Sequence, residues 1–230
     1  MVVSDIDLTT NSRVINPVTF LESTIKEPVL NLSNEYRYLK AGYYVSLHAE
    51  VLGNRVIPSC ENIIDSSRTP ILLLRASRAG VPTLPFLVTD SVKKIASDLG
   101  FPVLIFAVNP FIYDGYKTAS SKSSLYRAMK SLGMNYKFAV CAQPLKGEIV
   151  TFKTFFGKCP FQDRESQNIS QRVYEIFRIP VCKLHVQKTK EKAYLCGLQT
   201  LSKDELSGQD LLMISHEVSL ISEQGEPFGD

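Results

Sequence analysis

Two periodicities alternate along the chain and predict alternating strands and helices. A short apolar run at 29–32 suits a strand that is buried on both faces. Between 39 and 51 the apolar residues instead recur every four positions, which predicts an amphipathic helix with its stripe in the core. The stripe consists of Leu39, Tyr43, Leu47 and Val51. Residues 55–57 return to an extended pattern, so this stretch predicts a βαβ unit with parallel, neighbouring strands.

The same patterns predict the elements on either side of this unit. Residues 2–28 contain a first strand and a connecting helix of the same sheet. Further helices are expected at 59–68, 71–79, 92–99, 120–132 and 166–177. Further strands are expected at 86–88, 101–108, 136–142, 148–156, 181–186 and 193–198, the third and fourth joined as one hairpin and the last two as another. Ser202 to Glu205 forms a predicted capping box.

These elements predict an α/β protein in three parts. Residues 1–68 form the N-terminal half of a Rossmann-like domain with a parallel sheet. Residues 69–148 form an inserted α/β segment. Residues 149–230 form the C-terminal half, with a helix, an antiparallel hairpin and a polar tail.

Composition and charge narrow the class of protein. The chain has 230 residues, is 44% hydrophobic, and has a net charge of +3 without a block of like charges, so nothing indicates nucleic acid. No apolar run reaches the roughly 20 residues of a membrane span, and the N-terminus has no secretory pattern, so we expect a cytoplasmic protein. Five widely spaced cysteines and three scattered histidines form no motif typical of a metal site, a disulfide framework or a catalytic triad.

A polar, aromatic loop follows the strand at 29–32. In open α/β sheets, ligands bind at the carboxyl ends of the strands, beside helix N-termini. The loop residues Asn34, Tyr36, Arg37 and Tyr38 occupy this position, with Tyr43 and Tyr44 on the helix behind them. We take these six residues as candidate substrate-binding residues. The alternative is a hydrophobic staple with a solvated charge.

Three phrases in this stretch carry a family resemblance. They are Asn31-Leu32, Tyr36 with Tyr38, and Gly42-Tyr43-Tyr44-Val45-Ser46-Leu47 followed by Ala49-Glu50 and Gly53. Together they resemble the domain that precedes RimK-like ATP-grasp amide ligases. That family typically continues Asn-Leu with Cys-Arg and has a Ser after the second loop Tyr, where this chain has Ser33, Asn34 and Lys40.

The C-terminal third resumes the same resemblance. Its phrases are Phe155-Phe156-Gly157-Lys158, Ile176-Phe177 with Ile179-Pro180, and a hairpin ending near Leu198 to Leu206. The resemblance covers residues 1–68 and 150–206, and implies a domain beside a ligase that joins a carboxylate to an amine on amino-acid or peptide substrates. The chain is expected to end where the catalytic, nucleotide-binding domain would begin. The resemblance therefore implies no cofactor in this chain, with ATP and Mg only where that domain is present.

The middle segment is similar to a degenerate ATP-grasp nucleotide fold. Ala79-Gly80-Val81-Pro82-Thr83 and Gly100-Phe101-Pro102-Val103 resemble its entry. In that fold the next strand carries a Lys for the nucleotide phosphates, whereas 103–108 contains none. The loop after it has one Gly where close backbone approaches would need several. If this segment binds a nucleotide, the candidates are Asn109, Asp114, Gly115 and Lys117.

Three hypotheses follow for the function. The first is a non-catalytic, substrate-recognition domain that works with an ATP-grasp ligase domain or a separate catalytic subunit. The second is a free-standing, degenerate ATP-grasp-like module that binds a nucleotide or a peptide, and the third is a small enzyme with an unrecognised site. The chain is either complete or part of a longer, ATP-dependent carboxylate–amine ligase. The sequence does not decide whether it forms a homo-oligomer.

Overall fold

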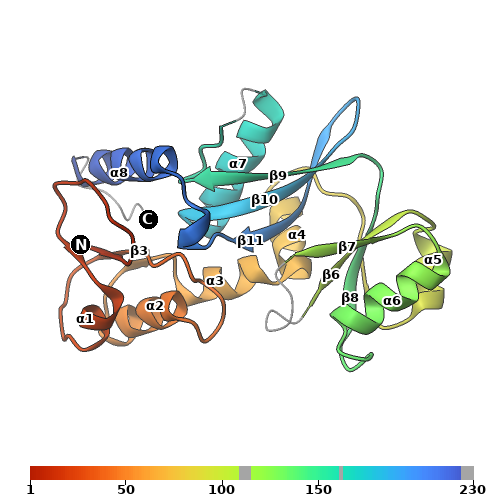
Figure 1. Cartoon of the computed structure of the whole chain (residues 1–230), viewed down its shortest axis with the longest axis horizontal. Coiled ribbons are helices and arrows are strands. Elements are labelled where there is room, and N and C mark those ends of the chain that lie inside the picture. The colour runs from red at the N-terminus through yellow and green to blue at the C-terminus, as the bar shows by residue number, and fades with distance from the viewer. Residues whose placement is uncertain (109–114, 161–162, 224–230) are drawn as a thin grey trace.

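Three β-sheets lie along the molecule (Figure 1). Sheet A is formed by the N-terminal part of the chain, sheet C by the middle part and sheet B by the C-terminal part, and sheet B lies between the other two. The computed structural model describes residues 1–108, 115–160 and 163–223. This mixture of one parallel and two antiparallel sheets with helices confirms the predicted α/β class.

Sheet A is built from the N-terminal strands, all of them parallel. In spatial order they are β2 (Val14–Ile15), β1 (Val2–Ser4), β3 (Val29–Leu32) and β4 (Val56–Ile57). Helices α1 (Pro17–Leu21) and α2 (Ala41–Val51) pack on it, and α3 (Cys60–Ser67) follows β4 and contacts β11 (Ala193–Thr200). The predicted βαβ unit is confirmed, because β3 and β4 are parallel neighbours joined through α2. Gly53 ends the helix with a φ of 78°, which favours glycine.

Sheet C is formed by the middle of the chain and is antiparallel. In spatial order its strands are β5 (Leu87–Thr89), β8 (Val140–Pro144), β6 (Val103–Ala107) and β7 (Tyr116–Ala119). Helices α5 (Val92–Asp98) and α6 (Lys122–Leu132) cover one face of it and bury a cluster with Leu125 and Met129. The Ser121 hydroxyl caps α6 by accepting the Ser124 backbone N–H.

Sheet B is antiparallel and has the order β11 (Ala193–Thr200), β10 (Val181–Lys188) and β9 (Glu148–Phe155). The predicted hairpin of β10 and β11 is confirmed. The predicted hairpin of 136–142 with 148–156 is wrong, because β8 pairs with β5 and β6 in sheet C whereas β9 pairs with β10. The Pro144 to Gly147 connection therefore carries the chain from one sheet to the next.

Three helices complete the fold around sheet B. Helix α4 (Thr69–Arg78) and helix α7 (Arg164–Phe177) both contact β11. After β11 the chain forms a short 3-10 helix, η1 (Lys203–Glu205), with the predicted capping box, and then α8 (Gly208–Glu223). Helix α8 lies beside the N-terminal segment, where the Thr9 backbone N–H donates to the Ser215 hydroxyl at 3.1 Å (Figure 1).

The predicted stripe of α2 is wrong at both of its ends. Leu39 precedes the helix with a φ of 64° and is 48% exposed, and Val51 is 76% exposed. The helix instead buries small groups toward sheet A, among them the Ser46 hydroxyl, which accepts the Asn31 amide and donates to the Pro58 carbonyl. A buried hydrogen bond can place a polar residue in the core, which hydrophobic periodicity does not detect.

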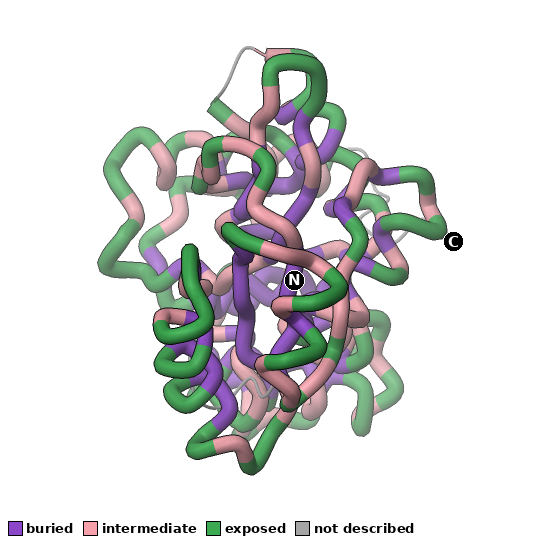
Figure 2. The backbone as a smooth tube through the Cα atoms, turned by 90° about the vertical axis from the view of Figure 1, so that its right-hand side faces the viewer, coloured by how far each residue is buried: buried purple, intermediate pink, exposed green. Residues whose placement is uncertain are grey.

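One apolar cluster joins the N-terminal part of the chain to sheet B and sheet C. Tyr36 comes from the loop after β3, Leu73 from α4, Phe106 from sheet C, Phe177 from α7 and Leu184 from sheet B. Figure 2 shows the buried backbone toward the middle of the molecule and exposed segments around it. All five cysteines are free.

Sheets B and C meet where Phe106 packs on Gly197. A Cβ added to Gly197 would lie 2.6 Å from Cε1 of Phe106. Because protein cores are close-packed, this contact leaves no room for a methyl group. Gly197 thus allows the Phe106 ring, on β6, to pack against the edge strand β11.

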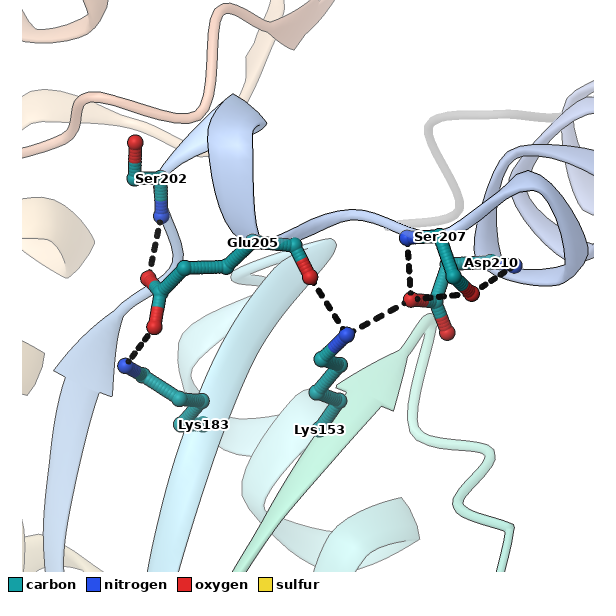
Figure 3. Close-up of polar contacts among 6 residues, drawn as sticks. All are labelled: Lys153, Lys183, Ser202, Glu205, Ser207 and Asp210. Atoms are coloured by element: carbon teal, nitrogen blue, oxygen red, sulfur yellow. Dashed lines mark hydrogen bonds and ion pairs between the residues drawn. The ribbon is translucent and has the colours of Figure 1, made fainter.

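Two lysines occupy directly opposite positions on β9 and β10. Lys153 pairs in register with Lys183, and like charges placed this way repel. The segment after β11 offsets this repulsion (Figure 3). The Glu205 carboxylate accepts a hydrogen bond from Lys183 Nζ at 2.7 Å, and the Glu205 backbone carbonyl accepts one from Lys153 Nζ at 2.5 Å. Asp210 forms a 2.7 Å ion pair with Lys153. These contacts fix η1 and the start of α8 on sheet B.

The pKa values of both carboxyl groups follow from this network. Partial burial alone would raise the pKa of Asp210, but the ion pair with Lys153 and hydrogen bonds from Ser207 lower it overall. Partial burial likewise acts against ionisation of Glu205, and its contacts with Lys183 and the Ser202 backbone lower its pKa.

We predict that Gly197→Ala destabilises the protein by about 1–3 kcal/mol, because the new methyl group overpacks the contact with Phe106. Thermal unfolding followed by circular dichroism measures the change. Gly208→Ala is the matched control, since its Cβ would have no atom within 4 Å, and should not destabilise the fold. Equal destabilisation by the two substitutions would contradict the packing argument.

We predict that Asp210→Asn lowers the melting temperature at pH 7 by roughly 2–4 °C, which corresponds to about 1 kcal/mol for a chain of this size. The folded-state pKa of Asp210 lies below its ordinary value of 3.8. Its contribution is therefore present above that pH and is lost as the pH falls through the folded-state pKa.

The difference between wild type and Asp210→Asn should accordingly shrink in melts recorded below pH 3.8. Asp204→Asn serves as the control, because the neighbouring Asp204 is exposed and has no ion pair among the described residues. A pH-independent difference would contradict the ion-pair account.

Candidate functional site

A small pocket opens where the loop after β3 meets the junction of α3 with α4, sheet C and β11. Its cavity volume is about 30 Å³, which is room for one or two waters or the tip of a ligand. The walls combine apolar side chains with hydroxyls and one guanidinium. They are formed by Tyr36, Arg37, Ile63, Ser66, Ser67, Thr69, Phe106, Ala107, Gly115, Ile179, Leu198 and Thr200.

Tyr36 is held rigidly in the inner wall. Its hydroxyl donates to the Asn31 carbonyl at 2.7 Å, and the side chain is only 2% exposed. Burial raises the pKa of Tyr36 well above its usual value, so the phenol stays neutral. Gly42 permits the close approach of this loop to α2, since a Cβ there would lie 2.7 Å from the Glu35 carbonyl oxygen. Tyr36 therefore shapes the pocket.

Arg37 contributes a charge that is already balanced. Its Nε donates to Glu35 Oε1 at 2.6 Å and its Nη2 to Glu35 Oε2 at 2.8 Å. The Arg37 and Glu35 side chains are 40% and 36% exposed, so this bidentate pair lies in contact with solvent. The edge of the pocket thus offers a guanidinium and a carboxylate side by side, with no net charge.

Two hydroxyls at the end of α3 donate to backbone carbonyls. Ser66 Oγ donates to the Ile63 carbonyl at 3.2 Å and Ser67 Oγ to the Ile64 carbonyl at 2.8 Å. Each hydroxyl has a single hydrogen, so its oxygen retains lone pairs for an N–H of a ligand.

The other predicted loop residues lie outside the pocket wall. Asn34 is 2% exposed with a φ of 56°, and neither polar atom of its side-chain amide has a hydrogen-bond partner among the described residues. Tyr38 packs edge-on against Tyr43 at 4.9 Å, and Tyr43 against Tyr44 at 5.9 Å. These three rings support the loop from behind.

Of the residues predicted as alternative nucleotide-binding residues, one lines the pocket. Gly115 lines the pocket. Lys117 lies on β7, and its Nζ donates to Ser131 on α6 at 2.8 Å. Asn109 and Asp114 lie outside the described residues.

Several wall residues were not found from the sequence. Ser66 and Ser67 lie at the end of the helix predicted at 59–68, Thr69 lies between the two predicted helices, and Thr200 follows the strand predicted at 193–198. Their short polar side chains are typical of caps and turns, so their spacing carries no signal of a site. Only tertiary packing brings them to Tyr36.

His185 lies near the pocket, packed among aromatic rings. Its Nδ1 lies 2.8 Å from Thr151 Oγ1, and its ring makes an edge contact with Tyr116 at 5.1 Å. Burial, with a further contribution from the Lys183 charge, lowers the pKa of His185 to about 4. The imidazole is therefore neutral near pH 7.

Among the described residues, no group of three or more His, Cys, Asp or Glu side chains could hold a metal ion. Lys153 and Lys183 are bound to Glu205 and Asp210, and the Lys117 Nζ donates to the Ser131 hydroxyl. Likewise, no helix in these ranges is long and apolar enough to cross a membrane.

Comparison with solved structures finds ATP-grasp proteins. D-alanine–D-alanine ligase from Bacillus anthracis is similar with a TM-score of 0.66 and 15% identity, over 98% of each chain. A RimK domain ATP-grasp protein from Sphaerobacter thermophilus has a TM-score of 0.63 and 14% identity, over 95% of this chain and 99% of the other. The ATP-grasp ligase PsnB in complex with a minimal precursor has a TM-score of 0.56 and 13% identity, over 86% and 80%.

These likenesses establish the fold, and they correct one expectation. The similarity to ATP-grasp structures runs through almost the whole chain, so the chain does not end where an ATP-grasp fold would begin. A search of curated protein sequences finds no match. The model of the RimK-like ATP-grasp N-terminal domain matches residues 19–216. The chain therefore belongs to the RimK-like ATP-grasp N-terminal domain family.

Proposed function

We propose that this chain is a non-catalytic domain that recognises an amino-acid or peptide substrate for an ATP-dependent amide ligase. The observation that carries the proposal is the lining of the pocket, which combines Arg37, paired with Glu35, with the hydroxyls of Ser66 and Ser67. These groups are suited to bind a peptide, and they include no evident nucleophile activated by a base.

The hydrogen-bonding groups of the pocket complement those of a peptide end. The free lone pairs of Ser66 and Ser67 accept backbone N–H groups, and the Arg37 guanidinium donates to a carbonyl or carboxylate oxygen. The apolar wall of Ile63, Phe106 and Leu198 suits a small aliphatic side chain.

The relatives support the same substrate class. D-alanine–D-alanine ligase acts on an amino acid, and PsnB is a ligase that was solved with its minimal precursor. We extend this to a catalytic ligase domain or subunit as the partner of this chain, which would supply ATP and Mg.

A nucleotide-binding module is the second candidate. Gly115, on the segment predicted for that role, does line the pocket. The engaged state of Lys117, Lys153 and Lys183 favours the peptide over the nucleotide, because phosphates would have to displace carboxylates that already hold two of these cations.

We predict that Arg37→Ala weakens binding of acetyl-dialanine, a carboxylate, by about fivefold or more. The substitution removes a donor and leaves the Glu35 carboxylate unpaired, which repels the ligand with about 1 kcal/mol at a solvated site. Binding of the neutral acetyl-dialanine methylamide should weaken less. Titrations followed by ¹H–¹⁵N NMR measure both affinities, with shifts expected at the backbone amides of Ser66, Ser67 and Thr200.

Arg13→Ala is the matched control, since Arg13 forms an equivalent exposed pair with Glu27 at 3.0 Å. It should bind both ligands like wild type. The proposal fails if neither ligand shifts the pocket amides in wild type, or if Arg13→Ala and Arg37→Ala have the same effect.

A further inference from the structure

The charge of the chain is concentrated in one part of it. Residues 87–146, which comprise sheet C with α5 and α6 and which we call the sheet C lobe, contain eight Lys and Arg against three Asp and Glu, a net charge of +5. The rest of the chain contains 18 basic and 20 acidic residues, a net charge of −2. The lobe lies at the opposite end of the molecule from α1 and α2 (Figure 1).

Most cations of the lobe are exposed and form no ion pair with a described residue. Seven of them are exposed to solvent and form no salt bridge with any described residue: Lys93, Lys94, Lys122, Arg127, Lys130, Lys137 and Lys146. Elsewhere, by contrast, Lys153, Lys158 and Lys183 are each paired. The lobe therefore presents a positive surface that no part of the described chain neutralises.

Two shallow hollows lie between these cations. One, of about 470 Å³, is lined by Lys93 and Lys122 with Val92, Ala96 and Ser97. The other, of about 520 Å³, is lined by Arg127 and Lys130 with Ser131, Met134 and Asn135. Each hollow thus combines two cations with an apolar or thioether wall.

Helix α6 sets the spacing of the two hollows. Lys122 and Lys130 are eight residues apart on it, which corresponds to about 12 Å along the axis. An extended peptide covers this distance with about four residues.

We propose that the sheet C lobe binds an extended acidic peptide, with one carboxylate at each hollow and about four residues between them. The carboxylates form ion pairs with the lysine and arginine side chains, and small apolar side chains of the peptide contact Val92, Ala96 and Met134. This interaction is independent of the function proposed above, because the residues of the hollows do not line the pocket at Tyr36.

A peptide suits this surface better than a nucleic acid. Single strands bind through aromatic rings on which bases stack. The exposed ring of Tyr126 instead packs against Tyr136 at 5.3 Å, and the Tyr136 hydroxyl donates to the Tyr126 carbonyl. The walls of the hollows carry no aromatic side chain.

Fluorescence anisotropy tests the proposal with a fluorescein-labelled peptide that carries two Glu-Glu pairs four residues apart. We expect binding to wild type that weakens with added salt, and at least tenfold weaker binding when the Glu residues are replaced by Gln. The triple variant Lys122→Glu, Arg127→Glu, Lys130→Glu should lose at least tenfold in affinity.

The matched control is Lys26→Glu, Lys40→Glu, Lys190→Glu, which changes three exposed lysines outside the lobe and the same net charge. Circular dichroism melts establish that both triple variants fold. Equal losses in the two variants would show attraction by net charge alone and overturn the proposal. So would the absence of binding to wild type, or tighter binding of a labelled oligothymidylate than of the acidic peptide.

Discussion

The apolar cluster that joins the loop after β3 to sheets B and C is the constraint on which the candidate site depends. Tyr36, Leu73, Phe106 and Leu184 come from segments that are far apart in the sequence, and their burial holds the loop after β3 against sheet B and sheet C. The pocket is what remains open at the edge of this cluster, so its polar groups are positioned by apolar packing. The packing of Phe106 on Gly197 requires that β11 carry no side chain at that position.

Much of the fold could be predicted from local signals. Caps and periodicity identified helices such as α6 and α7, and the crossover length identified the parallel pair of β3 and β4. Pairing between β8 and β9 could not be judged in this way, since a short connection joins strands of one hairpin or of two sheets equally well. Likewise, hydrophobicity alone placed Val51 in the core, whereas hydrogen bonding places Ser46 there.

The sequence predicted only the part of the candidate site that a local rule can identify. The rule that ligands bind at the carboxyl ends of parallel strands indicated the loop with Tyr36 and Arg37, and both line the pocket. The hydroxyls of Ser67 and Thr200 reach it only through the packing of α3 and β11, for which the sequence has no local signal. The opposed lysines of β9 and β10 are also invisible until the register is known, yet their contacts with Glu205 and Asp210 place α8.

The central proposal is that this chain recognises a peptide and does not itself hold a nucleotide. Calorimetric titration of the purified chain with Mg-ATP tests it most directly, under conditions sensitive to affinities of about 100 μM. We expect no binding heat, because Lys153 and Lys183 are held by Glu205 and Asp210 and Lys117 is directed to Ser131. Saturable binding of Mg-ATP that is lost in Lys117→Ala would contradict the account and favour a nucleotide-binding module.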